Sequence, residues 1–173
     1  MTTELADYLI RLDKYIFTDG EPAERFQIEI QYPMRFGLDL GTPDDDDQCL
    51  LLDVWESEKM AMRISLHHQD QATQHGLLRV DYGGGHKNPE EIIDSLPEKF
   101  HPYAGLRLNH QGGHIHYVVD GYKPLAWAIP LEADDFPVKS VAQREDYPRT
   151  LQAFLARINV KTEITFSNQL RIV

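Results

Sequence analysis

Apolar and polar positions recur along the chain with two different periods, which separate predicted helices from predicted strands. In residues 3–17 apolar side chains recur every three or four positions, as in an amphipathic helix, and Lys14 lies outside this stripe. A second helix is predicted from about Pro148 near the end of the chain. Between them, Asn88 as N-cap and Pro89 as first helical residue predict a short central helix.

Strand-like patterns occupy most of the remaining chain. Alternation with a period of two, or a short apolar run bounded by turn residues, predicts a strand. Such segments are residues 26–32, a short stretch after Pro33, and residues 49–55, 59–68, 77–82, 105–110, 114–119, 125–129 and 160–166. We therefore expect a single α+β domain over residues 1–173, with a mostly antiparallel sheet of about eight short strands and N-terminal, central and C-terminal helices.

Composition agrees with one globular domain and excludes several classes of protein. The chain has 173 residues, of which 42% are hydrophobic and 26% charged. Its single cysteine, Cys49, excludes a disulfide framework and a thiolate metal site, and its apolar surroundings predict a buried thiol. No apolar run approaches the ~18 residues of a membrane span, and the first residues lack a signal-peptide pattern. A cytoplasmic protein without membrane attachment is expected.

The net charge of −11 is confined to the first third of the chain. Residues 1–58 contain 15 acidic and 4 basic side chains, whereas acidic and basic residues are equal in number beyond them. An exposed loop is predicted at residues 41–48, with the acidic run Asp44 to Asp47 inside it. This segment would suit a basic protein partner. Because acidic and basic side chains balance in residues 59–173, the net charge of the chain does not exclude an anionic ligand there.

Residues 67–116 contain all eight histidines of the chain. Strand alternation places His114 and His116 on one face of the strand 114–119. A two-residue turn at Gly112-Gly113 would pair this strand with residues 105–110 and place Arg107 on the same face. Two further candidates are His86, which follows the loop Gly83 to Gly85, and His101, whose backbone is restricted by Pro102.

Three interpretations of the histidine face remain open. As a metal site for zinc, manganese or iron, His114 and His116 need a third ligand, for which the candidates are Asp81, His86, His101 and Asp120. As a phosphodiester site, one imidazole would act as base and the other as acid, while Arg107 stabilises the charge on phosphate. RNA or a nucleotide would be the substrate. The third interpretation is a solvent-facing set of histidines without chemistry.

Several of these residues also form a pattern found in other proteins. The chain from residues 77–82 to residues 122–130 resembles an uncharacterised prokaryotic domain family of unknown function. A strand ending in Arg-x-Asp, then a histidine, a proline-containing spacer and a closing His-x-His, also resembles TumE-like toxins of toxin–antitoxin systems. The resemblance implies an RNA-directed site that contains Arg79, Asp81, His86, His114 and His116. From the residues alone, Arg79 and Asp81 are expected to form an ion pair.

The sequence favours a phosphodiesterase or RNase-like enzyme. Its predicted catalytic residues are His114, His116, Arg107, His86 and His101, with Asp81 as a further metal ligand if a metal is used. The alternative is a non-catalytic, antitoxin-like regulatory domain that binds a basic protein through residues 1–58.

Overall fold

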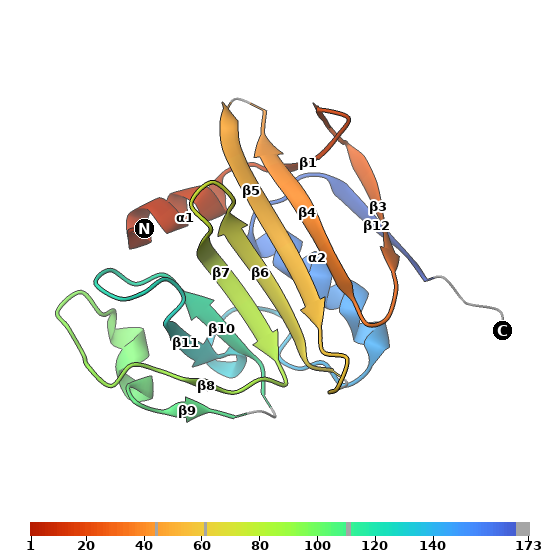
Figure 1. The fold of residues 1–173 in the computed structure, drawn as a ribbon. Helices are drawn as coiled ribbons and strands as arrows, with labels where there is room; N and C mark the ends of the chain where they lie inside the picture. The colour runs from red at the N-terminus through yellow and green to blue at the C-terminus, as the bar shows by residue number, and fades with distance from the viewer. Residues whose placement is uncertain (44, 61, 110–111, 169–173) are drawn as a thin grey trace.

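A computed structural model describes residues 1–43, 45–60, 62–109 and 112–168 (Figure 1). Its largest element is an eight-stranded antiparallel sheet with the strand order β11-β10-β7-β6-β5-β4-β1-β2. These strands are β1 (Tyr15–Thr18), β2 (Glu21–Pro22), β4 (Arg35–Thr42), β5 (Asp45–Glu56), β6 (Ile64–Asp70), β7 (His75–Tyr82), β10 (His114–Tyr117) and β11 (Trp127–Pro130). The prediction of an α+β fold with a mainly antiparallel sheet is confirmed.

Two small strand pairs accompany the main sheet. β12 (Glu163–Asn168) pairs in parallel with β3 (Arg25–Ile30), and β8 (His86–Lys87) pairs with β9 (Arg107–Leu108). The side chains of His86 and Asn88 hydrogen bond to backbone groups of Ala126 and Ala128, in and next to β11. This segment therefore satisfies backbone groups at the outer strand of the main sheet, where they would otherwise be open to pairing with another chain.

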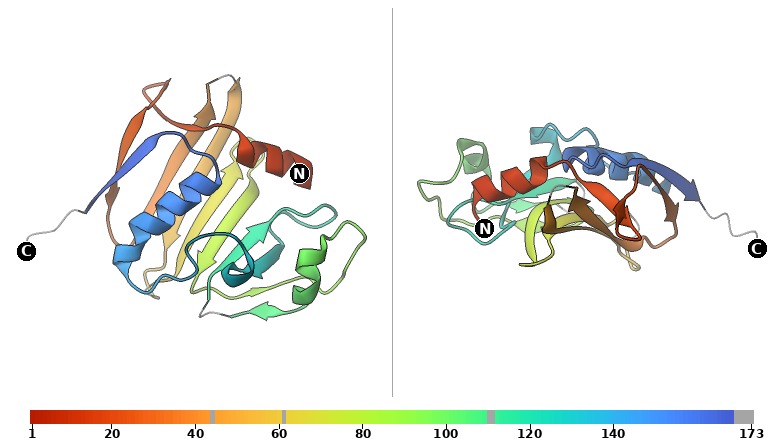
Figure 2. Two further views of the ribbon diagram at one scale, coloured as in Figure 1. Left: turned by 180° about the vertical axis from the view of Figure 1, so that it is seen from behind. Right: turned by 90° about the horizontal axis from the view of Figure 1, so that it is seen from above.

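The two α-helices cover one face of the main sheet. The helices α1 (Thr3–Arg11) and α2 (Tyr147–Arg157) lie on the same side when the molecule is seen from above (Figure 2). Alternate residues of β5, β6 and β7, such as Leu52, Leu66 and Val80, are fully buried in the core. The residues between them, which have the opposite orientation, form what we call the outer face, opposite the helices.

The N-terminal helix is shorter than its hydrophobic pattern predicts. It ends at Arg11, and Tyr15–Thr18 forms β1 instead, because pairing with β4 satisfies the backbone there. The predicted stripe is also wrong in detail, since Leu5 and Tyr8 are exposed and Lys14 is fully buried.

The predicted central helix from Asn88 is wrong. The side-chain amide of Asn88 is buried, where it donates to Ala128 O at 2.8 Å and accepts from Ala128 N at 2.9 Å. The chain instead forms 3₁₀ helices further along: η1 (Glu98–Tyr103), η2 (Leu131–Ala133) and η3 (Arg144–Asp146).

Two expectations for the first third also need correction. Gly41 and Thr42 belong to β4 and Asp45 begins β5, so the predicted loop at residues 41–48 is mostly strand. Cys49 is exposed because it lies on the opposite side of β5 from the buried Leu50. Asp44 and the side chains of residues 45–48 lie outside the described part of the chain, so the predicted acidic partner surface stays a prediction. None of the described helices is long and apolar enough to span a membrane.

His68, on the core side of β6, makes stability dependent on pH. It is fully buried and its Nδ1–H donates to Leu51 O at 3.1 Å. Burial, helped by the charge of Lys14, lowers the pKa of His68 to about 3. Because the unfolded state takes up this proton first, the free energy of unfolding should fall by about 1.4 kcal/mol for each pH unit below about 6.5.

We expect His68→Leu to remove this contribution. Urea unfolding at about pH 7 and about pH 5 should show a loss about 2 kcal/mol smaller for the variant than for the wild type. An equal loss in both proteins would contradict the assignment to His68.

Candidate active site

The strand register arranges polar side chains of the outer face in two neighbouring rows. Residues paired across antiparallel strands project from the same face, so each row is read from the pairing of β5, β6, β7 and β10. The first row contains Asp53, His67, Arg79 and His116. The second contains Trp55, Ser65, Asp81 and His114. The histidines of β10 therefore lie beside the arginine and aspartate of β7.

The hairpin predicted around Gly112-Gly113 does not form. β10 pairs with β7 and β11, whereas β9 pairs with β8. The apolar residue between the two histidines, Ile115, lies between Val80 and Ile129 and is fully buried. Burying this side chain in the middle of the sheet is favoured over pairing with the two-residue strand β9. Both histidines are consequently buried, which excludes the solvent-facing arrangement.

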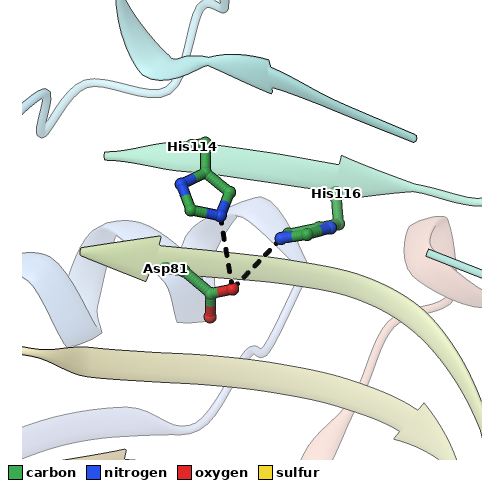
Figure 3. A group of neighbouring side chains, drawn as sticks. All are labelled: Asp81, His114 and His116. Atoms are coloured by element: carbon green, nitrogen blue, oxygen red, sulfur yellow. Dashed lines mark hydrogen bonds and ion pairs between the residues drawn. The ribbon is translucent and has the colours of Figure 1, made fainter. Parts of the chain in front are cut away.

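Asp81 is the central residue of the cluster (Figure 3). Its Oδ2 lies 3.5 Å from His114 Nε2, 3.1 Å from His116 Nε2 and 3.0 Å from Arg79 Nε. Burial alone would raise the pKa of Asp81, but the contact with His114 Nε2 and the charge of Arg79 hold this pKa well below its usual range. The carboxylate is therefore ionised at neutral pH, and the predicted ion pair with Arg79 is confirmed.

His116 is fixed in place by its neighbours. Its Nδ1–H donates to Leu125 O at 2.9 Å, so in the neutral ring the lone pair lies on Nε2 and accepts from Arg79 Nη2 at 2.9 Å. Nε2 also lies 3.1 Å from Asp81 Oδ2, but in this tautomer it has no proton to donate to the carboxylate. Burial lowers the pKa of His116 to about 4, so the ring is neutral at physiological pH. Arg79 thus bridges two acceptors, and His116 is a positioning residue for Arg79 and Asp81.

His114 differs from His116 because its ring nitrogens are not satisfied. The residue is 2% exposed, and neither nitrogen has a hydrogen-bond partner in the part of the chain that the structure describes. Its Nε2 faces Asp81 at 3.5 Å, beyond ordinary hydrogen-bond length. Buried polar atoms are almost always paired, and His114 is the one described residue in which two buried side-chain atoms lack a hydrogen-bond partner; the others, with one such atom each, are His67, His68, Arg79 and Trp127.

His86 joins the cluster from β8, as the sequence predicts. Its ring centroid lies 4.5 Å from that of His116 and 6.0 Å from that of His114. Its Nε2–H donates to Ala126 O at 2.9 Å, and burial lowers the pKa of His86. Two imidazoles therefore contact the carboxylate of Asp81, and the ring of His86 lies beside them.

The other predicted site residues are placed differently. His101 is exposed on η1, where Nε2 donates to Leu96 O at 3.1 Å, and none of its described contacts joins the cluster. Arg107 is exposed on β9, but together with Asn109 and His114 it lines a cavity of about 470 Å³. The prediction that paired strands would place Arg107 and His114 on one face is wrong, although the two residues line the same cavity. His110 lies outside the described residues.

Three members of the cluster have the donor atoms of a metal site. One ligand atom each from Asp81, His114 and His116 lies within 4.8 Å of the others, a set that suits zinc, manganese or iron. Of the predicted third ligands, Asp81 is the one in this set, while Asp120 accepts from Thr3 N. However, the guanidinium of Arg79 already contacts both His116 and Asp81. A metal would therefore bind there only if Arg79 moved away, since two cations repel each other.

The fold and the cluster define an α+β protein with a partly buried aspartate–histidine–arginine cluster on the helix-free face of an antiparallel sheet. The chain belongs to a family of unknown function, DUF6978, whose family model matches residues 1–160. This match confirms the resemblance to an uncharacterised domain family and does not show the similarity to TumE-like toxins. The comparisons with curated proteins and with solved structures found no match.

Proposed function

We propose that the protein is a phosphodiesterase that cleaves RNA, with His114 as the group that accepts the proton. The observation that carries this proposal is the orphaned imidazole of His114, which lines a cavity with Arg107 and faces the ionised Asp81. A cavity with an arginine suits an anionic substrate. The bridging position of Arg79 also favours an anion over a metal cation.

The roles of the residues follow from their contacts. When the Nε2–H of His114 is directed at Asp81, Nδ1 carries the lone pair and can accept a proton. The negative charge of the carboxylate, held by Arg79 and 3.5 Å from Nε2, favours this tautomer and stabilises the imidazolium that forms. Neither Asp81 nor His116 needs to exchange a proton, which agrees with their low pKa values.

The reaction that fits these groups is an internal transfer within RNA. His114 removes the proton of a 2′-hydroxyl, whose oxygen attacks the adjacent phosphorus while the bond from phosphorus to the 5′ oxygen breaks. A second imidazole, for which His86 is the candidate, donates a proton to the leaving 5′ oxygen from Nδ1 of its imidazolium form, because its Nε2–H is bonded to Ala126 O. Since burial lowers the pKa of His86, this form is more abundant at lower pH. Arg107 stabilises the charge on the phosphoryl oxygens. The products are a 2′,3′-cyclic phosphate and a 5′-hydroxyl.

A metal-dependent hydrolase is the second candidate, because Asp81, His114 and His116 offer three ligand atoms close together. In that case a bound metal would activate water, and the 2′-hydroxyl would not be required. The two candidates therefore differ in their dependence on metal and on the sugar of the substrate.

The test uses a pool of single-stranded RNA of random sequence and the matching 2′-deoxy pool, both in EDTA. We expect RNA to be cleaved to 2′,3′-cyclic ends and the deoxy pool to stay intact, as gel and mass analysis would show. Cleavage that is lost in EDTA and restored by Mn²⁺ or Zn²⁺ would favour the metal candidate. If RNA stays intact both with and without added metal, the metal-free RNase and the metal-dependent hydrolase are both contradicted.

A further inference from the structure

A second pocket, of about 270 Å³, lies on the outer face next to the cluster. Among its lining residues are Trp55, Arg63, Ser65, Arg79, Asp81 and Gly84. Asp81 and Arg79 belong both to this pocket and to the cluster that holds His114. A molecule in the pocket would therefore contact Asp81, the residue that faces the proposed reacting group.

Positive charge dominates this pocket. Arg79 is paired with Asp81 at 3.0 Å, so their charges compensate each other. Arg63 has no ion-pair partner among the described residues, and its guanidinium lies 3.8 Å from Met60 Sδ. The pocket thus contains one uncompensated cation, a second guanidinium and the hydroxyl of Ser65, a set of donors that suits a phosphate.

The glycine loop after β7 closes one side of the pocket. Gly83 has a φ of +68°, a backbone conformation that disfavours other residues. A Cβ on Gly83 would lie 3.2 Å from Met62 O and from Arg63 Cα. Glycine at this position therefore lets the loop pack directly against the backbone that carries Arg63.

Trp55 adds an aromatic surface to these donors. Its side chain is half-buried, and the guanidinium carbons of Arg35 and Arg63 each lie 5.9 Å from the centre of its ring. Single-stranded nucleic acids are bound where basic side chains hold the phosphates and aromatic rings stack on the bases. A metal ion would not use the indole, and an acidic peptide would not need it.

We propose that this pocket binds one phosphate and the adjoining base of a single-stranded RNA, next to the bond that His114 cleaves. The inference rests on the proposed function for the identity of the strand, whereas the pocket itself is defined by Arg63, Ser65 and Trp55. It places the substrate along the outer face, from the pocket across Asp81 to the histidine cluster.

Tryptophan fluorescence can test the pocket without any cleavage. The chain has two tryptophans, and Trp127 is fully buried, so a nucleotide that stacks in the pocket should quench the emission of Trp55. The probes are 2′-deoxyadenosine 5′-monophosphate, which cannot undergo the proposed reaction, and 2′-deoxyadenosine, which lacks the phosphate. We expect quenching by the monophosphate, weaker binding of the nucleoside and loss of the signal in Trp55→Phe.

Arg35 provides a matched control for Arg63. Both guanidinium groups lie at the same distance from the ring of Trp55, but Arg35 is paired with Glu58 and does not line the pocket. Arg63→Ala should raise the Kd of the monophosphate about 10-fold, and Arg35→Ala should change it less than about twofold. If both substitutions raise the Kd of the monophosphate equally, or if the monophosphate does not quench the wild type, the proposal that this pocket binds a nucleotide is wrong.

The same variants separate this inference from the proposed function. If nucleotide quenching depends on Arg63 but the protein leaves RNA intact, the result would support the nucleotide-binding pocket and contradict the proposed RNase activity. If Arg63→Ala cleaves RNA at the wild-type rate, the result would support the proposed RNase activity and contradict a role of the pocket in binding the substrate. Thermal unfolding of each variant checks that the fold is intact.

Discussion

His114→Gln should lower the rate of RNA cleavage about 1,000-fold and leave the fold intact. Glutamine keeps much of the volume of histidine, but it cannot accept a proton at neutral pH, and general acid–base groups contribute about 100- to 10,000-fold. Its effect on stability should be small because neither nitrogen of His114 has a hydrogen-bond partner among the described residues. We expect the free energy of unfolding to change by less than about 1 kcal/mol. Cleavage assays and urea unfolding of the same preparation measure both quantities.

Two further substitutions make this result specific. His116→Gln removes a ring that bonds Leu125 O and Arg79, so it should lower both the cleavage rate and the stability. His101→Gln, at an exposed residue of η1, should change neither. If His114→Gln cleaves RNA at the wild-type rate, His114 is not the proton acceptor and the proposed mechanism fails.

Local pattern was sufficient to predict which side chains share a face, because alternation is a property of a single strand. His114 and His116 lie on one side of β10, and Arg79 and Asp81 lie on one side of β7, as the sequence indicates. The neighbour of β10 could not be predicted in this way. Asp81 and His114 are 33 positions apart in the sequence, and their pairing depends on where the buried Ile115 finds apolar neighbours in β7 and β11.

Asn88 and Lys14 show a second limit of local pattern. Asparagine before proline is typical of a helix start, but the same amide can bond a strand backbone, as Asn88 does with Ala128. A lysine outside an apolar stripe normally indicates a solvated position. In both cases the buried polar side chain bonds a backbone group distant in the sequence, Ala128 for Asn88 and Ile158 for Lys14, and the hydrophobic periodicity of the chain does not show such a contact.

Lys14→Met should destabilise the protein by about 3 kcal/mol. The fully buried Nζ of Lys14 donates to Ile10 O at 2.8 Å, Leu12 O at 2.9 Å and Ile158 O at 2.8 Å. These carbonyls lie at the C-terminal ends of α1 and α2, where helix dipoles favour a cation. Methionine would fill similar space but leave three carbonyl acceptors, one buried and two partly buried, without this donor, at about 1 kcal/mol each.

Lys161 is a suitable control for Lys14, because it is a partly exposed lysine that pairs with Asp13 at 3.4 Å. Lys161→Met should cost less than about 1 kcal/mol in urea unfolding. A similarly small loss for Lys14→Met would show that the three carbonyls do not depend on Nζ of Lys14. Because both helices cover the face opposite the cluster, the folded fraction of Lys14→Met should still cleave RNA at the wild-type rate per molecule. Lys14→Met would then lower stability without lowering activity, whereas His114→Gln would lower activity without lowering stability. This pair of results would assign a structural role to Lys14 and a catalytic role to His114.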